Sequence, residues 1–296
     1  MPGRRPGPAT RSRGCRRRTV PAFPTLAAFP TAPAVPRAPG ALGVPTRPAG
    51  PVTLVRDTGV VLRTYRLGEA DRIVVLLTEE HGKVRAVAKG VRRTASKFGA
   101  RLEPLSHVAL LVWQGRSELG VVNQAEVVDH FRAVREDLRR VASGLSMLEV
   151  ADQVAQEGHP DPGLYRMLVG ALRALADPRH DPAMVVPAFF WKVLAHEGAA
   201  PVLTGCAACG ASASSVDLVA FDLTQGGALC RACRRGHPVS AGALEAVRRI
   251  LGGSLAQVLV SPPTCIGEVA ALATEAMEAH LDRRLRSVHA AAALSW

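Results

Sequence analysis

Short runs of apolar and β-branched residues follow one another between residues 57 and 130, and turn-forming residues separate them. The runs are Val60–Tyr65, Ile73–Thr78, Val84–Val87, His107–Trp113 and Leu119–Val128. Glycine occurs in the intervening turns, as in Leu67-Gly68-Glu69. Five short strands within about seventy residues predict a small antiparallel barrel or sandwich.

The spacing of apolar residues changes after Phe131. Steps of four and three residues connect Val134, Leu138, Val141, Leu145 and Leu148, which is the spacing of one helix face. Asp-Pro pairs at 161–162 and 181–182 open two further helices, of which the first runs through Leu175 and the second stops at Gly198. Two more helical stretches follow at Ala241–Leu251 and near Gly267–His289. Strands first and helices afterwards predict an α+β fold rather than an alternating α/β sheet.

The first fifty residues have a different composition, with nine Arg, eleven Pro and no acidic residue. Because proline fixes φ and lacks an N–H donor, we expect residues 1–51 to be disordered. Prolines also interrupt every apolar stretch there, which argues against a signal peptide. A natural start near Val52 is an equally simple interpretation. The strands then form a domain at 52–130, and the helices one at 131–296.

The positive charge is concentrated in one segment. The 296 residues include 37 Lys and Arg and 25 Asp and Glu, for a net charge of +12. Residues 56–101 carry 11 basic and 5 acidic side chains, whereas residues 102–296 carry 17 basic and 20 acidic ones. A basic segment in a neutral-to-acidic body predicts a localised site for a polyanion.

The loop after the third strand forms the centre of this segment. Its cations are Lys89, Arg92, Arg93, Lys97 and Arg101, which can reach successive phosphates and release counterions. The alternative is a solvated basic loop without a ligand. Phe98 lies among these cations, and a place in the core is the simpler expectation for it than stacking on a base.

Four of the six cysteines form two Cys-x-x-Cys pairs, Cys206 with Cys209 and Cys230 with Cys233. Four thiolates at this spacing can converge on one tetrahedral ion, and the twenty residues between the pairs allow a strand and its return. Two unrelated pairs, or one redox pair, would not explain the duplicated spacing. We therefore expect one structural Zn²⁺ in a finger at 203–236, in a reducing compartment. A closed four-thiolate site leaves no position for a catalytic water.

No other pattern predicts an active site. The chain lacks the glycine-rich phosphate loops and the nucleophile elbow, and His196-Glu197 has no second His four residues on. The uncharged run Thr19–Pro36 contains five prolines, which excludes a spanning helix. Trp113 alternates with apolar residues and is expected in the core. Arg132, Arg135 and Arg139 form a stripe at helical spacing, by default a solvated face.

Several segments together resemble the family of the bacterial DNA repair protein RecO. In the strand region they are Asp57-Thr-Gly-Val-Val-Leu-Arg-Thr-Tyr, Gly68-Glu-Ala-Asp-Arg-Ile-Val, Lys89-Gly-Val-Arg-Arg, Phe98 and Leu102-Glu-Pro. In the helical region they are Phe189-Phe-Trp-Lys-Val-Leu, Gly198-Ala-Ala-Pro, Cys206-Ala-Ala-Cys-Gly, Phe221-Asp and the second cysteine pair. The resemblance covers about residues 54–290. The tail is the departure, because members of the family usually begin close to the first strand.

The resemblance implies an N-terminal OB-fold barrel, a helical domain with an inserted four-cysteine zinc finger, and a cytoplasmic, nucleoid-associated protein. It also implies a recombination mediator that binds single- and double-stranded DNA and anneals complementary strands. Such a mediator acts with RecR to load RecA onto DNA coated by single-strand-binding protein. No bond is made or broken, so we expect no enzyme activity, no small-molecule substrate and no membrane partner.

For the DNA site we expect the loop cations to act together with Arg63, Arg66 and Arg72 on the first strands. For the acidic C-terminal tail of single-strand-binding protein we expect a cation beside an apolar groove, with Arg132 or Arg139 next to Leu138. A zinc-ribbon nucleic-acid-binding regulator or ribosome-associated factor, without annealing activity, is the alternative. A nuclease would need clustered carboxylates or His, and a scaffold that touches no DNA remains open.

Overall fold

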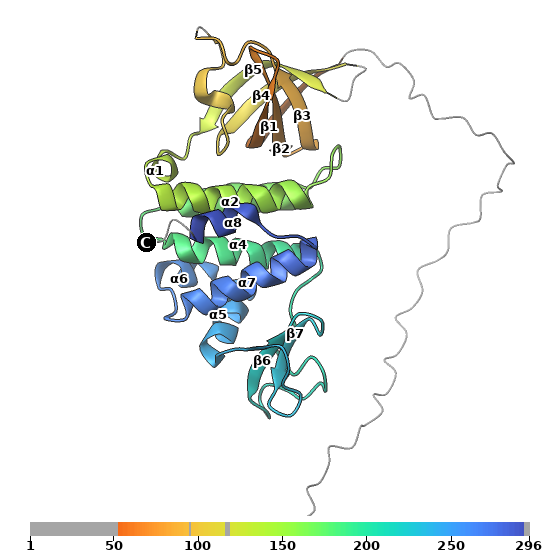
Figure 1. Cartoon of the computed structure of the whole chain (residues 1–296), viewed down its shortest axis with the longest axis vertical. Helices are drawn as coiled ribbons and strands as arrows, with labels where there is room; N and C mark the ends of the chain where they lie inside the picture. The colour runs from red at the N-terminus through yellow and green to blue at the C-terminus, as the bar shows by residue number, and fades with distance from the viewer. Residues whose placement is uncertain (1–52, 95, 116–118, 293–296) are drawn as a thin grey trace, which may run out of the picture. The chain divides into compact units, whose positions relative to one another are not determined.

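The computed structural model describes residues 53–94, 96–115 and 119–292, so the expectation for residues 1–51 lies outside the described residues. Residues 53–129 form a closed five-stranded barrel with strand order β1-β2-β3-β5-β4 (Figure 1). The strands are β1 Thr53–Leu67, β2 Asp71–Thr78, β3 Gly82–Ala88, β4 His107–Gln114 and β5 Gly120–Asp129. Neighbours pair antiparallel except β3 and β5, which pair parallel. The five expected strands and their small barrel are confirmed.

The barrel has its own apolar interior. Alternate strand residues such as Val74, Leu76, Val108 and Leu110 point inward and are fully or almost fully buried. Phe98 joins them from the connection between β3 and β4, where a short 3₁₀ helix, η1, spans Gly99–Leu102. The expectation that Phe98 belongs to the core is therefore confirmed, and a stacking role for it is excluded by its burial.

A second core joins the helices to the outside of the barrel. Its strand residues are Val60, Leu62, Val75 and Leu77, which face outward from the barrel. The helices are α1 Arg132–Arg135, α2 Leu138–Val154, α3 Pro162–Ala176, α4 Pro182–His196, α5 Ala241–Leu251, α6 Leu255–Val260, α7 Ile266–Leu281 and α8 Arg286–Ala292. The apolar helix α4 contacts α2, α3, α5, α6 and α7, so it forms the centre of the helical domain.

Helix boundaries differ from the sequence expectation in two places. The face from Val134 to Leu148 is interrupted, because the Asp137 side chain accepts backbone N–H bonds and begins α2 as a separate helix. Leu138 is consequently 64% exposed, although the spacing placed it on the buried face. The stretch 267–289 is divided by Asp282 in the left-handed region, φ 49°, into α7 and α8. The short α6 was not expected.

A small sheet is inserted between α4 and α5. Its strands are β6 Leu218–Asp222, β7 Gly227–Cys230 and β8 His237–Pro238, in the order β7-β6-β8. The Asp222 carboxylate accepts bonds from the backbone N–H groups of Thr224 and Gln225, which fixes the turn between β6 and β7. The Trp191 ring on α4 meets Phe221 edge-on at 6.1 Å, so the inserted sheet packs on the helical core.

Candidate nucleic-acid interface and metal centre

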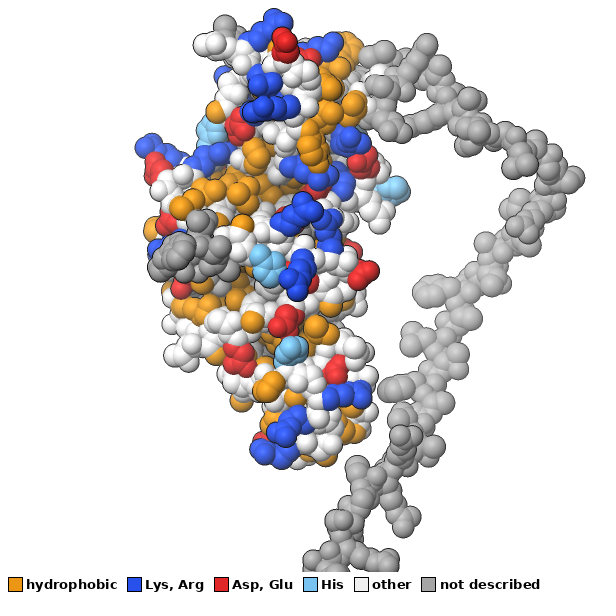
Figure 2. All heavy atoms as spheres, viewed as in Figure 1, with side chains coloured by type: hydrophobic (Ala, Val, Ile, Leu, Met, Phe, Trp, Pro, Cys, Tyr) orange, Lys and Arg blue, Asp and Glu red, His pale blue; other side chains and the backbone are white. Residues whose placement is uncertain are grey.

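Lysine and arginine side chains gather over the barrel, next to hydrophobic ones (Figure 2). Five of the cations lie on the connection from β3 to β4, and all five are exposed. Lys89 and Arg93 form no ion pair or side-chain hydrogen bond with any residue that the structure describes. Their charges are therefore available to an anion without the loss of an internal contact.

The other three cations of this loop also hold it in place. Arg92 donates to the backbone oxygen of Glu69 at 2.8 Å, Arg101 to that of Lys97 at 2.7 Å, and Lys97 to that of Asn123 at 2.7 Å. Carbonyl partners leave the formal charge uncompensated. The loop consequently presents five positive charges on a backbone that these bonds constrain.

The arginines expected on β1 and β2 are placed differently. Arg63 forms an ion pair with Asp152 on α2, with its Nε 3.0 Å from the carboxylate, and Arg72 forms one with Glu103. Arg66 is exposed and has no partner among the described residues. Arg66 is therefore available to bind an anion, whereas Arg63 and Arg72 are each paired with a carboxylate of the protein. No local sequence pattern indicates these two pairs.

The three arginines of the expected stripe differ in their contacts. Arg135 bonds the oxygens of His130 and Pro104 and the Ser106 hydroxyl, so it is part of the fold. Arg132, with its side chain 88% exposed, pairs with Glu136 at 2.7 Å, and Arg139 is exposed. Leu138, exposed as described above, lies in the same segment.

The expectation that Trp113 belongs to the core is wrong. Trp113 is 43% exposed on the outside of the barrel, where the cross-strand partner Leu54 is 44% exposed. Strand alternation could have shown this, because Val108, Leu110 and Val112 are the interior residues of β4 and Trp113 follows with the opposite parity.

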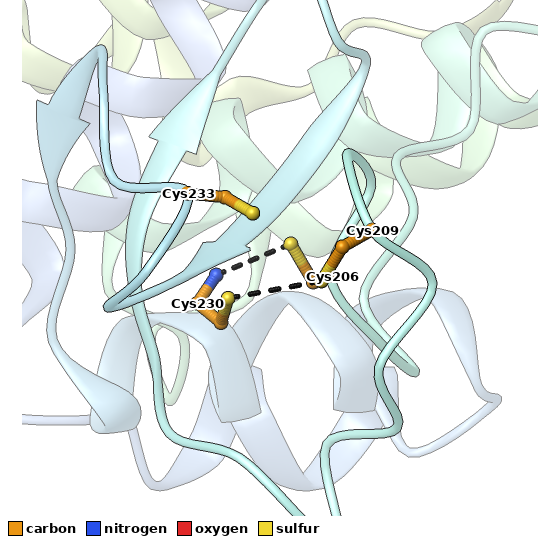
Figure 3. A group of neighbouring side chains, drawn as sticks. All are labelled: Cys206, Cys209, Cys230 and Cys233. Carbon is orange, nitrogen blue, oxygen red and sulfur yellow. Dashed lines mark hydrogen bonds between the residues drawn. The ribbon is translucent and has the colours of Figure 1, made fainter. Parts of the chain in front are cut away.

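The four cysteines meet between the inserted sheet and the chain that leads into it. Cys206 and Cys230 are buried, Cys233 is half-buried and Cys209 is exposed. All four Sγ atoms lie within 4.8 Å of one another, and those of Cys209 and Cys230 are 3.9 Å apart (Figure 3). Tetrahedral Zn–S bonds of about 2.3 Å would separate sulfurs by about 3.8 Å. The cluster could bind one metal ion.

Backbone donors already favour negative charge at this cluster. Burial opposes ionisation of Cys206, but backbone N–H groups, with that of Cys230 at 3.4 Å from its sulfur, lower the pKa of its thiol to about 6. Burial and the neighbouring thiols raise the pKa of Cys233 to about 12. Four thiolates therefore repel one another unless a cation compensates them, which fits a divalent ion that thiolates prefer.

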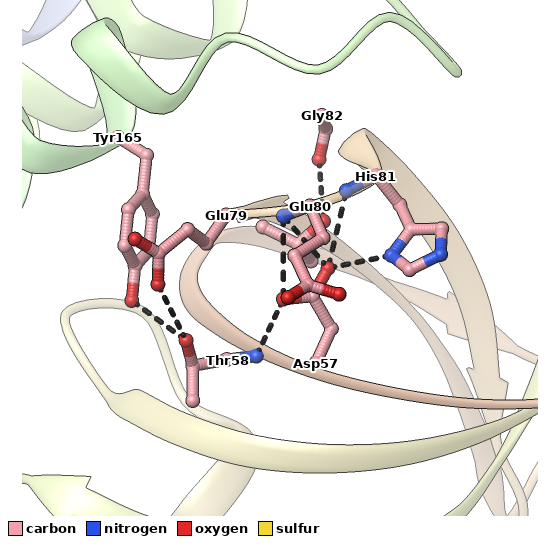
Figure 4. Close-up of polar contacts among 8 residues, drawn as sticks. Asp57, Thr58, Glu79, Glu80, His81, Gly82 and Tyr165 are labelled. Carbon is pink, nitrogen blue, oxygen red and sulfur yellow. Dashed lines mark hydrogen bonds and ion pairs between the residues drawn. The ribbon is translucent and has the colours of Figure 1, made fainter.

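A polar junction connects the barrel to α3 (Figure 4). The Tyr165 hydroxyl donates to the Thr58 hydroxyl at 3.0 Å and bonds His107 Nε2 at 2.7 Å. Burial lowers the pKa of His107, and the charge of Arg173 acts in the same direction. Asp57 accepts from the backbone N–H groups of Thr58, Glu80 and His81. These contacts join the barrel to α3, and His107 Nδ1 is buried there without a hydrogen-bond partner among the described residues.

One further group of possible metal ligands, Asp161, His196 and Glu197, lies at the surface. Asp161 accepts the Leu164 N–H at the start of α3 and both its oxygens bond His196. These bonds use the carboxylate as a helix cap. In the part of the chain that the structure describes, no helix has the length and apolar character needed to cross a membrane.

Two family models match almost all of the described chain. Recombination protein O N terminal matches residues 52–131, and Recombination protein O C terminal matches residues 135–289. Curated relatives named DNA repair protein RecO, from Streptomyces avermitilis and Streptomyces coelicolor, are each 42% identical over 246 residues. These alignments cover 80% of this chain and 98% of each relative. The barrel, the helical domain and the cysteine cluster thus occur in a chain that belongs to the RecO family of DNA repair proteins.

Proposed function

We propose that this protein is a non-catalytic recombination mediator that binds DNA on its barrel and anneals complementary single strands. The observation that carries the proposal is the loop between β3 and β4, where Lys89 and Arg93 are exposed and unpaired among the described residues. Phosphates that bind there release condensed counterions, which gives affinity for any DNA sequence. Membership of the RecO family supplies the context of DNA repair and recombination.

Annealing follows from charge screening. Two DNA strands repel one another through their phosphates, and a basic surface that holds one strand lowers this repulsion for the second. Base pairing then supplies the free energy, so the protein needs neither a nucleotide cofactor nor a covalent step. The relevant DNA contacts are Arg66, Lys89, Arg92, Arg93, Lys97 and Arg101, with smaller contributions from the paired Arg63 and Arg72.

The direct test is the rate at which two labelled complementary oligonucleotides anneal, measured with the full chain and with no nucleotide present. We expect a rate well above that of the DNA alone, intact strands, and inhibition by salt. Intact strands and an unchanged rate, with a folded protein that binds DNA, would overturn the annealing proposal and favour a zinc-ribbon regulator. Strand cleavage that depends on a divalent metal would instead indicate a nuclease.

For the cysteine cluster we propose one structural Zn²⁺ held by Cys206, Cys209, Cys230 and Cys233. The sulfur separations and the thiol donor set fit this ion. The ion would contribute positive charge that stabilises the thiolates and so holds the inserted sheet against α4. Four protein ligands close the site, so its role is stability.

The partners that we propose are RecR and the C-terminal tail of single-strand-binding protein, with RecA loading as the outcome. For an acidic, apolar tail, the exposed Leu138 and the exposed cations Arg132 and Arg139, which are close to it in the sequence, offer matching chemistry. We expect the double variant Arg132→Ala, Arg139→Ala to weaken binding of a fluorescent tail peptide by about tenfold, since two charge contacts are lost. Arg179→Ala, on the loop between α3 and α4, is the control. Unchanged peptide affinity in the double variant would remove this site.

A further inference from the structure

The outer face of the barrel carries apolar side chains that no described element covers. Leu54 on β1, Trp113 on β4 and Val121 on β5 are consecutive cross-strand partners, so they lie side by side across three strands. The Trp113 and Leu54 side chains are each more than two-fifths exposed. Leu54 and Trp113 form a contiguous exposed apolar patch, which is a common feature of binding surfaces.

Positive charge flanks this row on two sides. Arg56 lies two residues beyond Leu54 on the same face of β1, and it is exposed without a partner among the described residues. On β5 the chain bulges at Asn123, between the partners of Leu111 and Val112, and Lys97 donates to the Asn123 oxygen. The basic loop therefore reaches the strand that pairs with Trp113. A flat aromatic surface between cations matches a nucleic-acid backbone with accessible bases.

We propose that Trp113 stacks on an unpaired base and that the protein consequently binds single-stranded DNA more tightly than double-stranded DNA. This inference rests on the proposed DNA-binding function and assigns its strand selectivity to a residue outside the basic loop. In a duplex the faces of the bases are covered by their neighbours, so only the loop cations contact it. A single strand gains the same phosphate contacts and the stacking contact in addition.

The change Trp113→Ala should weaken binding of a dT oligonucleotide about tenfold and binding of a duplex of equal length less than twofold. Trp113→Phe should retain most of the single-strand affinity, because an aromatic face remains. Val128→Ala, which shortens an exposed apolar side chain on β5 outside this row, is the matched control and should change neither affinity. Affinities are measured by anisotropy at one fixed salt concentration.

A fluorescence titration gives a second readout that needs no truncation at position 113. The chain has three tryptophans, of which Trp191 is buried in the helical core. In a Trp296→Phe protein, emission from Trp113 should be quenched as dT oligonucleotide binds, whereas bound duplex should leave it nearly unchanged. If the alanine variant fails to fold, this titration alone tests whether Trp113 stacks on a base.

The outcomes separate the two proposals. If the wild-type protein binds neither form of DNA, the proposed function fails. If it binds both but Trp113→Ala lowers both affinities equally or neither, or if bound dT leaves the emission unchanged, only the stacking proposal is overturned. In that case the row of Leu54 and Trp113 would be a protein-binding face.

Discussion

The change Cys230→Ser is expected to lower the zinc content from about one ion per chain to near zero and to unfold the finger. Cys230 is buried at the end of β7, and its N–H and sulfur both contact the other cysteines. Because metal binding at such sites is coupled to folding, with apparent free energies of about 10–16 kcal/mol in zinc-finger peptides, loss of one ligand should cost several kcal/mol. Metal content is measured by atomic absorption, and exposure of the finger by limited proteolysis.

The effect should extend beyond the finger, because Phe221 packs against Trp191 and Arg248 on α5 donates to the Leu203 oxygen at 2.8 Å. We therefore expect a lower Tm for the helical domain also, and the same change on chelation of the wild-type protein. Cys265→Ser is the matched control, since this thiol lies outside the cluster. Freshly purified wild-type protein with less than about a third of an equivalent of zinc would contradict the four-thiolate site.

The second large effect is expected from the pair Lys89→Glu and Arg93→Glu. These side chains have no described partners, so their reversal should leave the fold intact while it removes two phosphate contacts. Each contact contributes about 0.9 to the slope of log affinity against log salt, so the slope should become shallower by about 2. The affinity for DNA should fall at least about tenfold at moderate salt.

The control for this pair is Arg166→Glu with Arg284→Glu, which changes the net charge equally on the helical domain, where both arginines are exposed and unpaired among the described residues. Binding isotherms at several salt concentrations give both the affinity and the slope. An equal loss in the control pair would mean that only net charge matters. An unchanged slope for the Lys89 and Arg93 variant would show that DNA does not bind this loop.

Local sequence patterns were sufficient wherever the relevant contacts are local. The Cys-x-x-Cys spacing indicated the cluster because each pair occupies one turn, and short apolar runs between turn residues indicated the five strands. The helix starts at Asp161 and Asp181 were found because a capping carboxylate precedes proline.

Contacts between distant residues could not be predicted in this way. The ion pair of Arg63 with Asp152, far along the chain on α2, is not indicated by any local pattern. Lys97 is bonded to the bulge at Asn123, and no motif marks that approach. Leu138 fitted the helical spacing, yet the cap at Asp137 starts a new helix and leaves it exposed. For Arg63 and Lys97 the deciding contacts are between distant residues, whereas at Leu138 a second local signal, the cap at Asp137, outweighed the apolar spacing.

In the proposed function, free cations on the barrel allow the protein to bring complementary strands together. Its most direct test compares annealing of strands coated with single-strand-binding protein by the wild-type chain, the Lys89→Glu, Arg93→Glu variant and the Arg166→Glu, Arg284→Glu control. We expect faster annealing with the wild type and the control, and a rate near that of the DNA alone with the barrel variant. Equal rates with all three folded, zinc-loaded proteins would contradict it.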